Sequence, residues 1–446
     1  MRLFNLLSVL LLSFGSLVQA ADEEPGKTVL LNNVNIFDGT ALETRTGSVL
    51  IKNNIIEKVV YETAPDISAD LVIDGKGGFL TPGLIDAHSH SVFGADELDV
   101  LYGDQSYVQI LSSKEMTEML HRGVTTIRDA GGNSFGLKRA IDEGILEGPR
   151  IYPSGPLISQ YSGHGDFRFE DPTVLPKEWG GPLAPGEKNG HVMLANGTDQ
   201  VKQATRNALF HGATQIKLAV TGGVSSFTDP LFVSEFDSEE ISAAVAAAAD
   251  YGTYVMVHSH SSPGIIRAVE SGVKSVEHGT LLNEKAAKIM AEKDVYYIPN
   301  FEVLSQLKPI YTDKIRKAKL KMALLGLDHS MKMAKKYDLT IGWGTDLLFS
   351  YEGRKNQLQD LVLRKQWFES SEIMVQATGN GGKIVALSGK RNPYGKIGVI
   401  EEKAMADILI YNKNPVEDVS VVADYENTLS FIMKDGEIIK NRLDGD

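Results

Sequence analysis

The sequence predicts an α/β fold in which a (β/α)8 TIM-like barrel is joined to a small β-sandwich domain built from both chain ends. In the middle of the chain, apolar runs typical of strands alternate with amphipathic runs typical of helices. Such alternation indicates parallel βα units, and about eight of them close a barrel. Towards both ends, short strand-like runs are separated or followed by turn residues such as Asp74-Gly75 and Asp435-Gly436, which indicates a small sheet or sandwich.

The strands and helices are expected in the following order. The leading small-domain strands are predicted at residues 28–36, 48–51, 55–61 and 71–73. The barrel region predicts strands at residues 124–128, 215–220, 254–257, 273–276, 295–299 and 340–343, with helices at residues 135–143, 198–211, 238–250 and 265–271. The closing strands are predicted at residues 406–411, 429–434 and 437–439. The predicted domains are a signal peptide at residues 1–20, a small domain from residues 21–80 and 390–446, and a barrel over residues 81–389.

The composition excludes several functional classes. The chain of 446 residues has a formal net charge of -13 and no long basic run, which argues against a nucleic-acid partner. It contains no cysteine, so any metal site must use His, Asp, Glu or Lys. A loop at residues 161–190 is rich in Gly and Pro, and loops of this length are often functional. A homo-oligomer is compatible with this composition.

The first residues have the pattern of an export signal. Arg2 provides a short basic region, residues 3–18 are mainly apolar, and Val18-Gln19-Ala20 resembles a small-residue cleavage site. We therefore expect an exported, periplasmic protein whose leader is cleaved and which is not stably inserted in a membrane. The alternative is a retained N-terminal anchor, for which the run is short.

Two histidines follow the first apolar residues of the barrel region. His88 and His90 come shortly after Leu84 and Ile85. Since residues two apart in a strand point to the same side, both imidazoles can reach one ion. Alone, this pattern is weak, because polar residues at a strand end produce the same spacing.

Three further candidates stand at the ends of predicted strands. His258 and His278 each follow an apolar strand-like run, and Asp346 follows residues 341–345. The carboxyl ends of parallel strands are where the active-site groups of a βα barrel gather. Taken singly, each histidine could be an ordinary polar residue and Asp346 an N-cap. Taken in order on successive strands, they indicate a metal site.

Lys217 lies inside the apolar strand predicted at residues 215–220. A buried ammonium is costly unless it is paired or chemically altered. In one interpretation the stem packs in the strand and the ammonium reaches solvent. In the other, a neutral amine captures carbon dioxide to form a carbamate, an anionic group whose two oxygens could bridge two metal ions.

At this point the sequence resembles the amidohydrolase superfamily, over nearly all of the chain after the predicted leader. The motifs that carry the resemblance are FLTPGLIDAHSH at residues 79–90, SVEHGT at residues 275–280, GWGTD at residues 342–346 and ADILI at residues 406–410. Lys217 followed by TGGV at residues 221–224 is similar to the metal-dependent dipeptidase and imidazolonepropionase-related branch.

The resemblance implies a binuclear metal-dependent amide hydrolase. By that resemblance His88, His90 and Asp346 bind one divalent ion, His258 and His278 bind the second, and carboxylated Lys217 bridges the two. Zinc is the expected metal, and the same ligands also suit manganese, cobalt or iron. The implied reaction is attack of a metal-bound hydroxide on the scissile carbonyl, with Asp346 moving the proton to the leaving amine.

The expected substrate is a small peptide or amide, cleaved by a dipeptidase or carboxypeptidase-like enzyme that releases a C-terminal amino acid. His260 stands where some proline-releasing relatives have tyrosine, which puts proline specificity in doubt, and it is expected to contact the substrate and its oxyanion. His164 and Arg168, in the long loop, are further candidates for substrate contact, Arg168 for a carboxylate. Each of the three could instead be a solvent-facing residue.

Other functions would use parts of the same pattern. A lactonase, an N-acyl amino acid or ochratoxin-type amidase, and a cyclic-amide hydrolase would share the site. Ring deaminases of the superfamily usually hold one metal and lack the bridging lysine, so Lys217 counts against deamination. A periplasmic carrier on a degenerate scaffold would not need the complete ligand set. A phosphate loop at residues 379–383 is disfavoured, because Ile384 stands where Ser or Thr is required.

Overall fold

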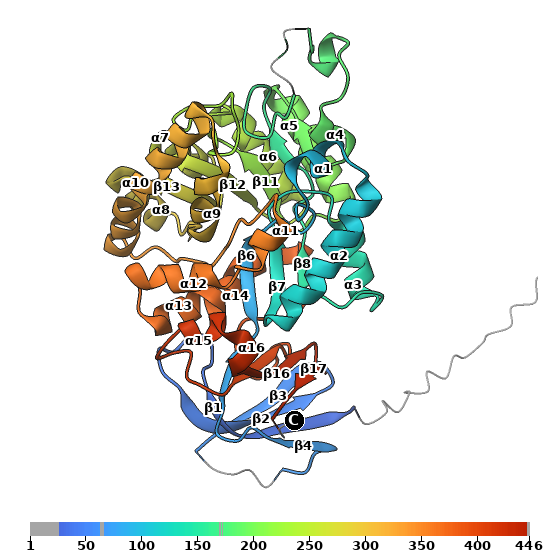
Figure 1. The fold of residues 1–446 in the computed structure, drawn as a ribbon, viewed down its shortest axis with the longest axis vertical. Helices are drawn as coiled ribbons and strands as arrows, with labels where there is room; N and C mark the ends of the chain where they lie inside the picture. The colour runs from blue at the N-terminus through green and yellow to red at the C-terminus, as the bar shows by residue number, and fades with distance from the viewer. Residues whose placement is uncertain (1–25, 63–66, 169–170, 172, 444–446) are drawn as a thin grey trace, which may run out of the picture.

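The computed structural model describes residues 26–62, 67–168, 171 and 173–443, so the predicted signal peptide lies outside the described residues. The molecule is elongated, with a β-rich domain at one end and a barrel wrapped by helices above it (Figure 1). Parallel strands build the barrel, and a mixed sheet from both chain ends builds the β-rich domain. The predicted fold class is therefore confirmed.

Both chain ends contribute strands to one mixed sheet. Hydrogen bonding follows the order β17-β16-β15-β5-β1-β2-β3, and β4 pairs with β1. The strands are β1 (Thr28–Ile36), β2 (Arg45–Lys52), β3 (Ile55–Tyr61), β4 (Leu71–Asp74), β5 (Phe79–Pro82), β15 (Ile408–Tyr411), β16 (Leu429–Lys434) and β17 (Glu437–Asn441). Leu31, Val49 and Phe431 are fully buried in its core. β5 extends past residue 80, the predicted limit of the small domain.

The barrel strands run parallel to one another. They are β6 (Leu84–Ser89), β7 (Val124–Asp129), β8 (Arg150–Tyr152), β9 (Leu157–Ser159), β11 (Ile216–Ala219), β12 (Val255–Ser261), β13 (Ser275–Leu281) and β14 (Tyr296–Ile298), with β10 (Val192–Leu194) beside β9. A parallel bridge links β14 to Ile341, and the Ala87 amide donates to Trp343 O at 2.7 Å. The Thr214 amide donates to Pro153 O at 2.8 Å, which joins β11 to the end of β8. These contacts close the barrel.

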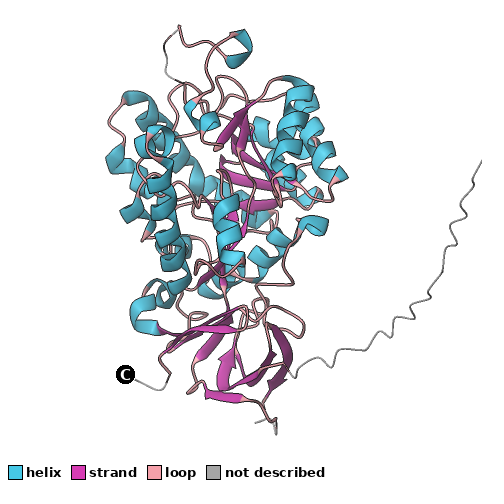
Figure 2. Ribbon diagram, turned by 90° about the vertical axis from the view of Figure 1, so that its right-hand side faces the viewer, coloured by secondary structure: helices cyan, strands magenta, loops and turns pink. Residues whose placement is uncertain are grey.

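Helices cover the outside of the barrel and its junction with the β-rich domain (Figure 1 and Figure 2). They are α1 (Glu97–Tyr102), α2 (Gln105–His121), α3 (Phe135–Asp142), α4 (Pro185–Lys188), α5 (Gly197–Phe210), α6 (Ser238–Asp250), α7 (Ser262–Glu270), α8 (Glu284–Glu292), α9 (Glu302–Ile310), α10 (Lys314–Lys336), α11 (Tyr351–Arg354), α12 (Gln359–Leu363), α13 (Ser370–Ala377), α14 (Gly379–Ala386), α15 (Ser420–Ala423) and α16 (Tyr425–Thr428). In the described part of the chain, none combines the length and apolar character needed to span a bilayer.

The glycine-rich stretch at residues 379–383 is the start of helix α14. A Cβ on Gly381 would lie 2.7 Å from Ile85 Cβ, and one on Gly382 would lie 2.2 Å from Ile397 O. The glycines therefore let the helix pack closely against β6 and the adjoining backbone. This packing accounts for the motif without a phosphate.

Candidate metal centre

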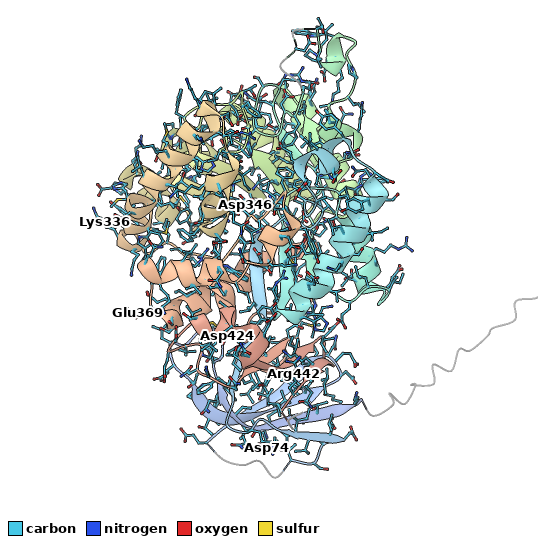
Figure 3. All side chains as sticks on the ribbon, in the orientation of Figure 1. Asp74, Lys336, Asp346, Glu369, Asp424 and Arg442 are labelled. Carbon is cyan, nitrogen blue, oxygen red and sulfur yellow. The ribbon has the colours of Figure 1, made fainter. Side chains whose placement is uncertain are left out.

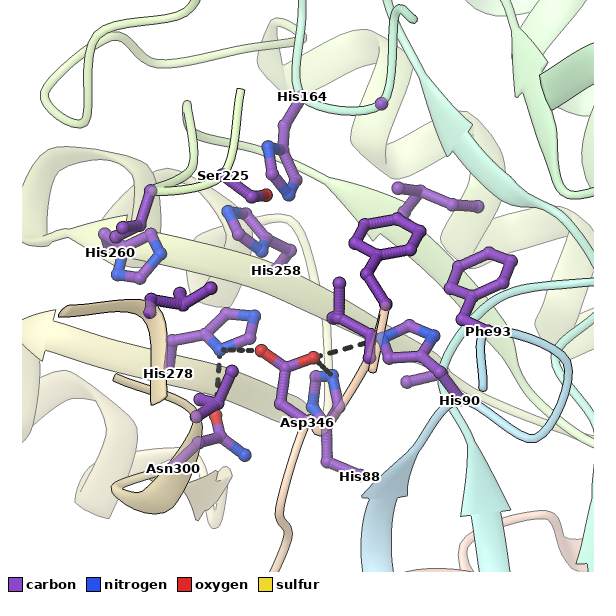
Figure 4. Close-up of a pocket in the computed structure, with 18 of the residues that line it drawn as sticks. His88, His90, Phe93, His164, Ser225, His258, His260, His278, Asn300 and Asp346 are labelled. Carbon is purple, nitrogen blue, oxygen red and sulfur yellow. Dashed lines mark hydrogen bonds and ion pairs between the residues drawn. The ribbon is translucent and has the colours of Figure 1, made fainter. Parts of the chain in front are cut away.

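Side chains that the sequence singled out lie together in the barrel, and Figure 4 shows five of them, His88, His90, His258, His278 and Asp346. Asp346 sits in the body of the barrel, far from Asp74 in the β-rich domain (Figure 3). One cavity is lined by six of these residues. We call these six residues the metal centre: His88, His90, Lys217, His258, His278 and Asp346. Strand geometry thus brings together residues from distant parts of the chain.

Asp346 occupies the middle of the metal centre. Its Oδ1 lies 3.3 Å from His88 Nε2 and 3.1 Å from His90 Nε2, and its Oδ2 lies 3.6 Å from His278 Nδ1. Burial raises the pKa of Asp346, but the charge of His88 and the close contacts with the His88 and His90 rings outweigh it and hold the pKa well below its usual range. The carboxylate is therefore ionised and can serve as a ligand or a proton acceptor.

Hydrogen bonds on the far ring nitrogens fix two of the histidines. His88 Nδ1 lies 2.8 Å from Glu277 Oε2, and His278 Nδ1 lies 2.8 Å from Asn300 Oδ1. Nε2 of each ring is buried without a hydrogen-bond partner among the described residues, since the contact of His88 Nε2 with Asp346 lacks hydrogen-bond geometry. Buried nitrogens are normally satisfied, and metal-binding histidines are typically held through the opposite nitrogen. The orphaned Nε2 atoms therefore fit a cation.

Two groups of ligand atoms each lie within 4.8 Å of one another: His258 with His260 and His278, and His88 with His278 and Asp346. Burial lowers the pKa of His258 and His278 well below the ordinary value and that of His260 to about 3. These rings are therefore neutral at pH 7, the form that binds metal ions. The donor set fits two divalent cations side by side.

Lys217 lines the same cavity and is only 3% exposed. Burial lowers the pKa of its amine to about 8, against the raising effect of the Glu277 and Asp346 charges. A neutral amine is the form that reacts with carbon dioxide, so this environment favours carbamate formation. The alternative in which the ammonium reaches solvent does not fit this burial.

Behind His88 lies a buried ion pair that the sequence interpretation missed. Glu277 accepts from Arg128 Nη2 at 2.8 Å and from Ser275 Oγ at 2.6 Å, while its contact with His88 holds that ring. Burial raises the pKa of Glu277, but Arg128 and His88 lower it to about 2. The only sign of this ion pair in the sequence was a charged residue, Glu277, inside the SVEHGT motif.

The structure treats the three predicted substrate contacts differently. His260 lines the cavity, with Nδ1 2.9 Å from Thr280 Oγ1. His164 also lines it, and its ring stacks on His258 with centroids 4.0 Å apart. Arg168 does not line the cavity, because Asp166 captures its guanidinium at 2.8 and 2.7 Å. In this structure Arg168 is therefore not placed to contact a substrate in the cavity.

Much of the remaining cavity wall is apolar. Phe93 stacks between His90, at 5.1 Å, and Phe349, at 5.7 Å. The other apolar lining side chains include Leu157, Phe167, Val192, Val224, Val303, Leu304, Leu307 and Leu348. Most come from loops and from α9, where no strand pattern could predict them. Such walls exclude water and accept apolar substituents.

Comparisons with known proteins agree with this geometry. The model of the amidohydrolase family matches residues 79–445. Ochratoxinase of Aspergillus niger is 28% identical over 453 residues, covering 95% of this chain and 89% of that protein. A solved structure of that ochratoxinase has a TM-score of 0.81 at 26% identity, covering 94% of this chain and 96% of the other.

Two further solved structures resemble almost the whole chain. A prolidase complexed with N-methylphosphonate-L-proline is 30% identical with a TM-score of 0.85, covering 93% of this chain and 100% of the other. A Xaa-Pro dipeptidase with bound methionine in its active site is 26% identical with a TM-score of 0.80, again covering 93% and 100%. Ochratoxinase is thus found both by sequence and by structure.

Proposed function

Because the chain belongs to the amidohydrolase family and is a hydrolase of amide bonds, we propose that it is a binuclear, zinc-dependent dipeptidase or carboxypeptidase-like enzyme. Its substrate would be a small peptide or N-acyl amino acid, from which it releases the C-terminal residue. The observation that carries the proposal is the metal centre itself, with Asp346 in its middle and orphaned Nε2 atoms on His88 and His278.

We assign the metal ligands as the donor set suggests. His88, His90 and Asp346 would hold one ion, His258 and His278 the other, and carboxylated Lys217 would lie between them. When bound, the ions would activate water and polarise the scissile carbonyl. The buried amine of Lys217 and its lowered pKa support this assignment.

The side chains of the protein supply the remaining steps. Asp346 accepts the proton of the attacking water at Oδ2, the oxygen less engaged by histidines, and passes it to the leaving nitrogen. His260 can donate from Nε2 to the developing oxyanion if Nδ1 accepts from the Thr280 hydroxyl, which lies 2.9 Å away. The apolar walls keep bulk water away from these groups.

A second candidate is an ochratoxin-type or N-acyl amino acid amidase on the same site. The apolar cavity wall favours it, because a bulky aromatic acyl group could pack against Phe93 and Phe349. The similarity to ochratoxinase over 95% of the chain supports the same choice. Among the described residues, no arginine lines the cavity to select a charged leaving residue.

Activity on a substrate panel tests both candidates. Purified protein loaded with zinc should be assayed on Xaa-Pro, Xaa-Arg and Xaa-Phe dipeptides, on N-acyl phenylalanine amides and on a lactone. We expect amide hydrolysis that a chelator abolishes and zinc, manganese or cobalt restores. Metal-loaded protein that cleaves no amide, or chelator-treated protein that retains full activity, would contradict the proposed function. Preference for the lactone would move the assignment to ester hydrolysis.

We also propose that the protein is exported and its leader removed. The pattern of residues 1–20 supports this. N-terminal sequencing of protein from the periplasmic fraction should begin at or near Ala21. Recovery of the uncut chain in the membrane fraction would instead indicate a retained anchor.

A further inference from the structure

We propose that Asp229 and Lys319 are positioning residues that hold the His164 ring in one orientation and one tautomer over the metal centre. The inference rests on the proposed function only in that His164 contacts the substrate. The two residues are far apart in sequence, on the loop after β11 and on helix α10. Both are buried, at 1% and 7% exposure.

The loop after β11 packs directly against the His164 ring. An antiparallel bridge between Thr221 and Ser234 closes this loop at its base. A Cβ on Gly223 would lie 2.1 Å from the ring of His164, so the loop leaves no room between them. Val224, the next residue, lines the cavity. Any movement of this loop would therefore change both the cavity wall and the ring.

Lys319, on helix α10, holds the loop after β11 through hydrogen bonds to its backbone. Its Nζ donates to Ser226 O at 2.8 Å and to Gly223 O at 3.1 Å, and it lies 3.6 Å from Asp229 Oδ1. A buried ammonium is stable only when its donors are satisfied and a counter-charge is near, and this loop supplies both. Lys319 thus ties helix α10 to the segment that contacts His164.

Asp229 determines which ring nitrogen carries the proton. Its Oδ2 accepts from the Gly223 amide at 2.7 Å and lies 3.3 Å from His164 Nδ1. Ser226 Oγ lies 3.1 Å from the same nitrogen and donates its own hydrogen to Gly223 O at 3.3 Å. Both neighbours are acceptors, so Nδ1 bears the proton. In the neutral ring, Nε2 is then an acceptor, beside the stacked His258 (Figure 4).

The backbone of His164 is held separately from its ring. Its amide donates to Glu235 Oε1 and Oε2 at 2.9 and 3.0 Å. Loss of the Asp229 carboxylate would therefore free the His164 ring, while the backbone of His164 would stay bound to Glu235. A small misplacement of a group that contacts the substrate weakens binding and reaction, which makes the effect measurable.

A double-mutant cycle tests this coupling. In the zinc-loaded enzyme, Asp229→Asn should raise KM about tenfold with kcat nearly unchanged, the loss expected for one oriented hydrogen bond. In the His164→Ala background the same substitution should have no further effect, because the ring it positions is gone. An equal effect of Asp229→Asn in both backgrounds would overturn the proposal.

Lys319→Met should raise KM in the same way, and Lys319→Arg, which keeps a cationic donor, should restore it. Lys321→Met, on an exposed lysine of the same helix, is the matched control and should leave KM unchanged. If Lys319→Met does not fold, the KM values of Lys319→Arg and Asp229→Asn are compared instead. A normal KM in the first and a raised KM in the second still support the positioning role. A raised KM in Lys321→Met equal to that of the Lys319 variants would overturn the specific role.

The tautomer can be read without any activity. In zinc-loaded protein with 15N-labelled histidine, the His164 signals, identified by their loss in His164→Gln, should show a proton on Nδ1. Asp229→Asn should give a mixture of both tautomers. A proton on Nε2 in the unsubstituted protein would overturn the inference even if the enzyme hydrolyses amides. Failure of the proposed function would instead appear as a lack of chelator-sensitive hydrolysis.

Discussion

Replacing Lys217 by methionine should stabilise the metal-free protein while it abolishes hydrolysis. Methionine keeps a similar apolar stem and removes the charge. Folding lowers the pKa of Lys217 from 10.5 to about 8. At about 1.4 kcal/mol per unit, the buried charge costs the folded state about 3 kcal/mol. The variant should recover up to that amount at pH 7.

The pH dependence gives the sign of the effect. Below pH 8 the folded and unfolded states both carry the charge, and the folded state bears the whole cost. Between pH 8 and 10.5 the folded state releases its proton first, so the free energy of unfolding of the unsubstituted protein should rise with pH. The advantage of Lys217→Met should therefore shrink as the pH increases.

Urea unfolding of chelator-treated protein at pH 7 and pH 10 measures the free-energy cost of the buried Lys217 charge. Lys274→Met, on an exposed lysine next to the start of β13, is the matched control and should change stability little. In the zinc-loaded protein, loss of the bridging ligand should lower kcat/KM at least ~100-fold. A metal-free variant less stable than the unsubstituted protein at pH 7 would refute the burial argument. Normal turnover by the loaded variant would refute the bridging role.

Three further outcomes follow from the geometry. Glu277→Gln leaves buried Arg128 without its counter-charge, so urea unfolding should show a loss of about 3–5 kcal/mol, and chelator competition should show metal affinity weakened about 10–100-fold. Arg168→Ala should leave KM within about twofold, because Asp166 already holds the guanidinium; a larger rise would restore Arg168 as a substrate contact. Burial raises the pKa of Glu235 from 4.5 to about 8, so folding retains a proton that the unfolded chain loses above pH 4.5, and stability should fall with pH over that window. Glu235→Gln should flatten this fall in urea unfolding measured from pH 5 to 8, and an unchanged slope would contradict it.

The alternation of side chains along a strand explains what could be predicted from the sequence. Ile216 and Leu218 pack in the main core, so Lys217 between them must face the barrel interior. The same rule sends His258 and His260 to one side of β12. In a regular strand, the position of a residue determines which way its side chain points. The location of the site can then be predicted from the carboxyl ends of the strands.

Long-range pairs and loop contacts had no comparable signal. Arg128 and Glu277 are 149 residues apart, and neither shows in its own strand that the other will neutralise it. Arg168 was a candidate for binding a substrate carboxylate, but the local loop conformation places the Asp166 carboxylate, two residues before it, against the guanidinium. The aromatic wall at Phe93 comes from irregular chain after β6, where no period predicts direction.

Backbone strain at the metal centre explains why the alternation of side chains along a strand does not predict all of its residues. On β13, Ser275 and Glu277 point inward and Val276 packs in the outer core, so a regular strand would turn His278 outward. Instead His278 adopts a φ of +68°, and Asp346 adopts a φ of +56°. Such conformations cost about 1–3 kcal/mol in residues other than glycine and persist only where the surroundings enforce them. Here the left-handed turn brings His278 to Asp346 and Asn300, so the strain has a direct structural result. A strand kept regular through His278 would leave the proposed second ion without one of its two histidine ligands.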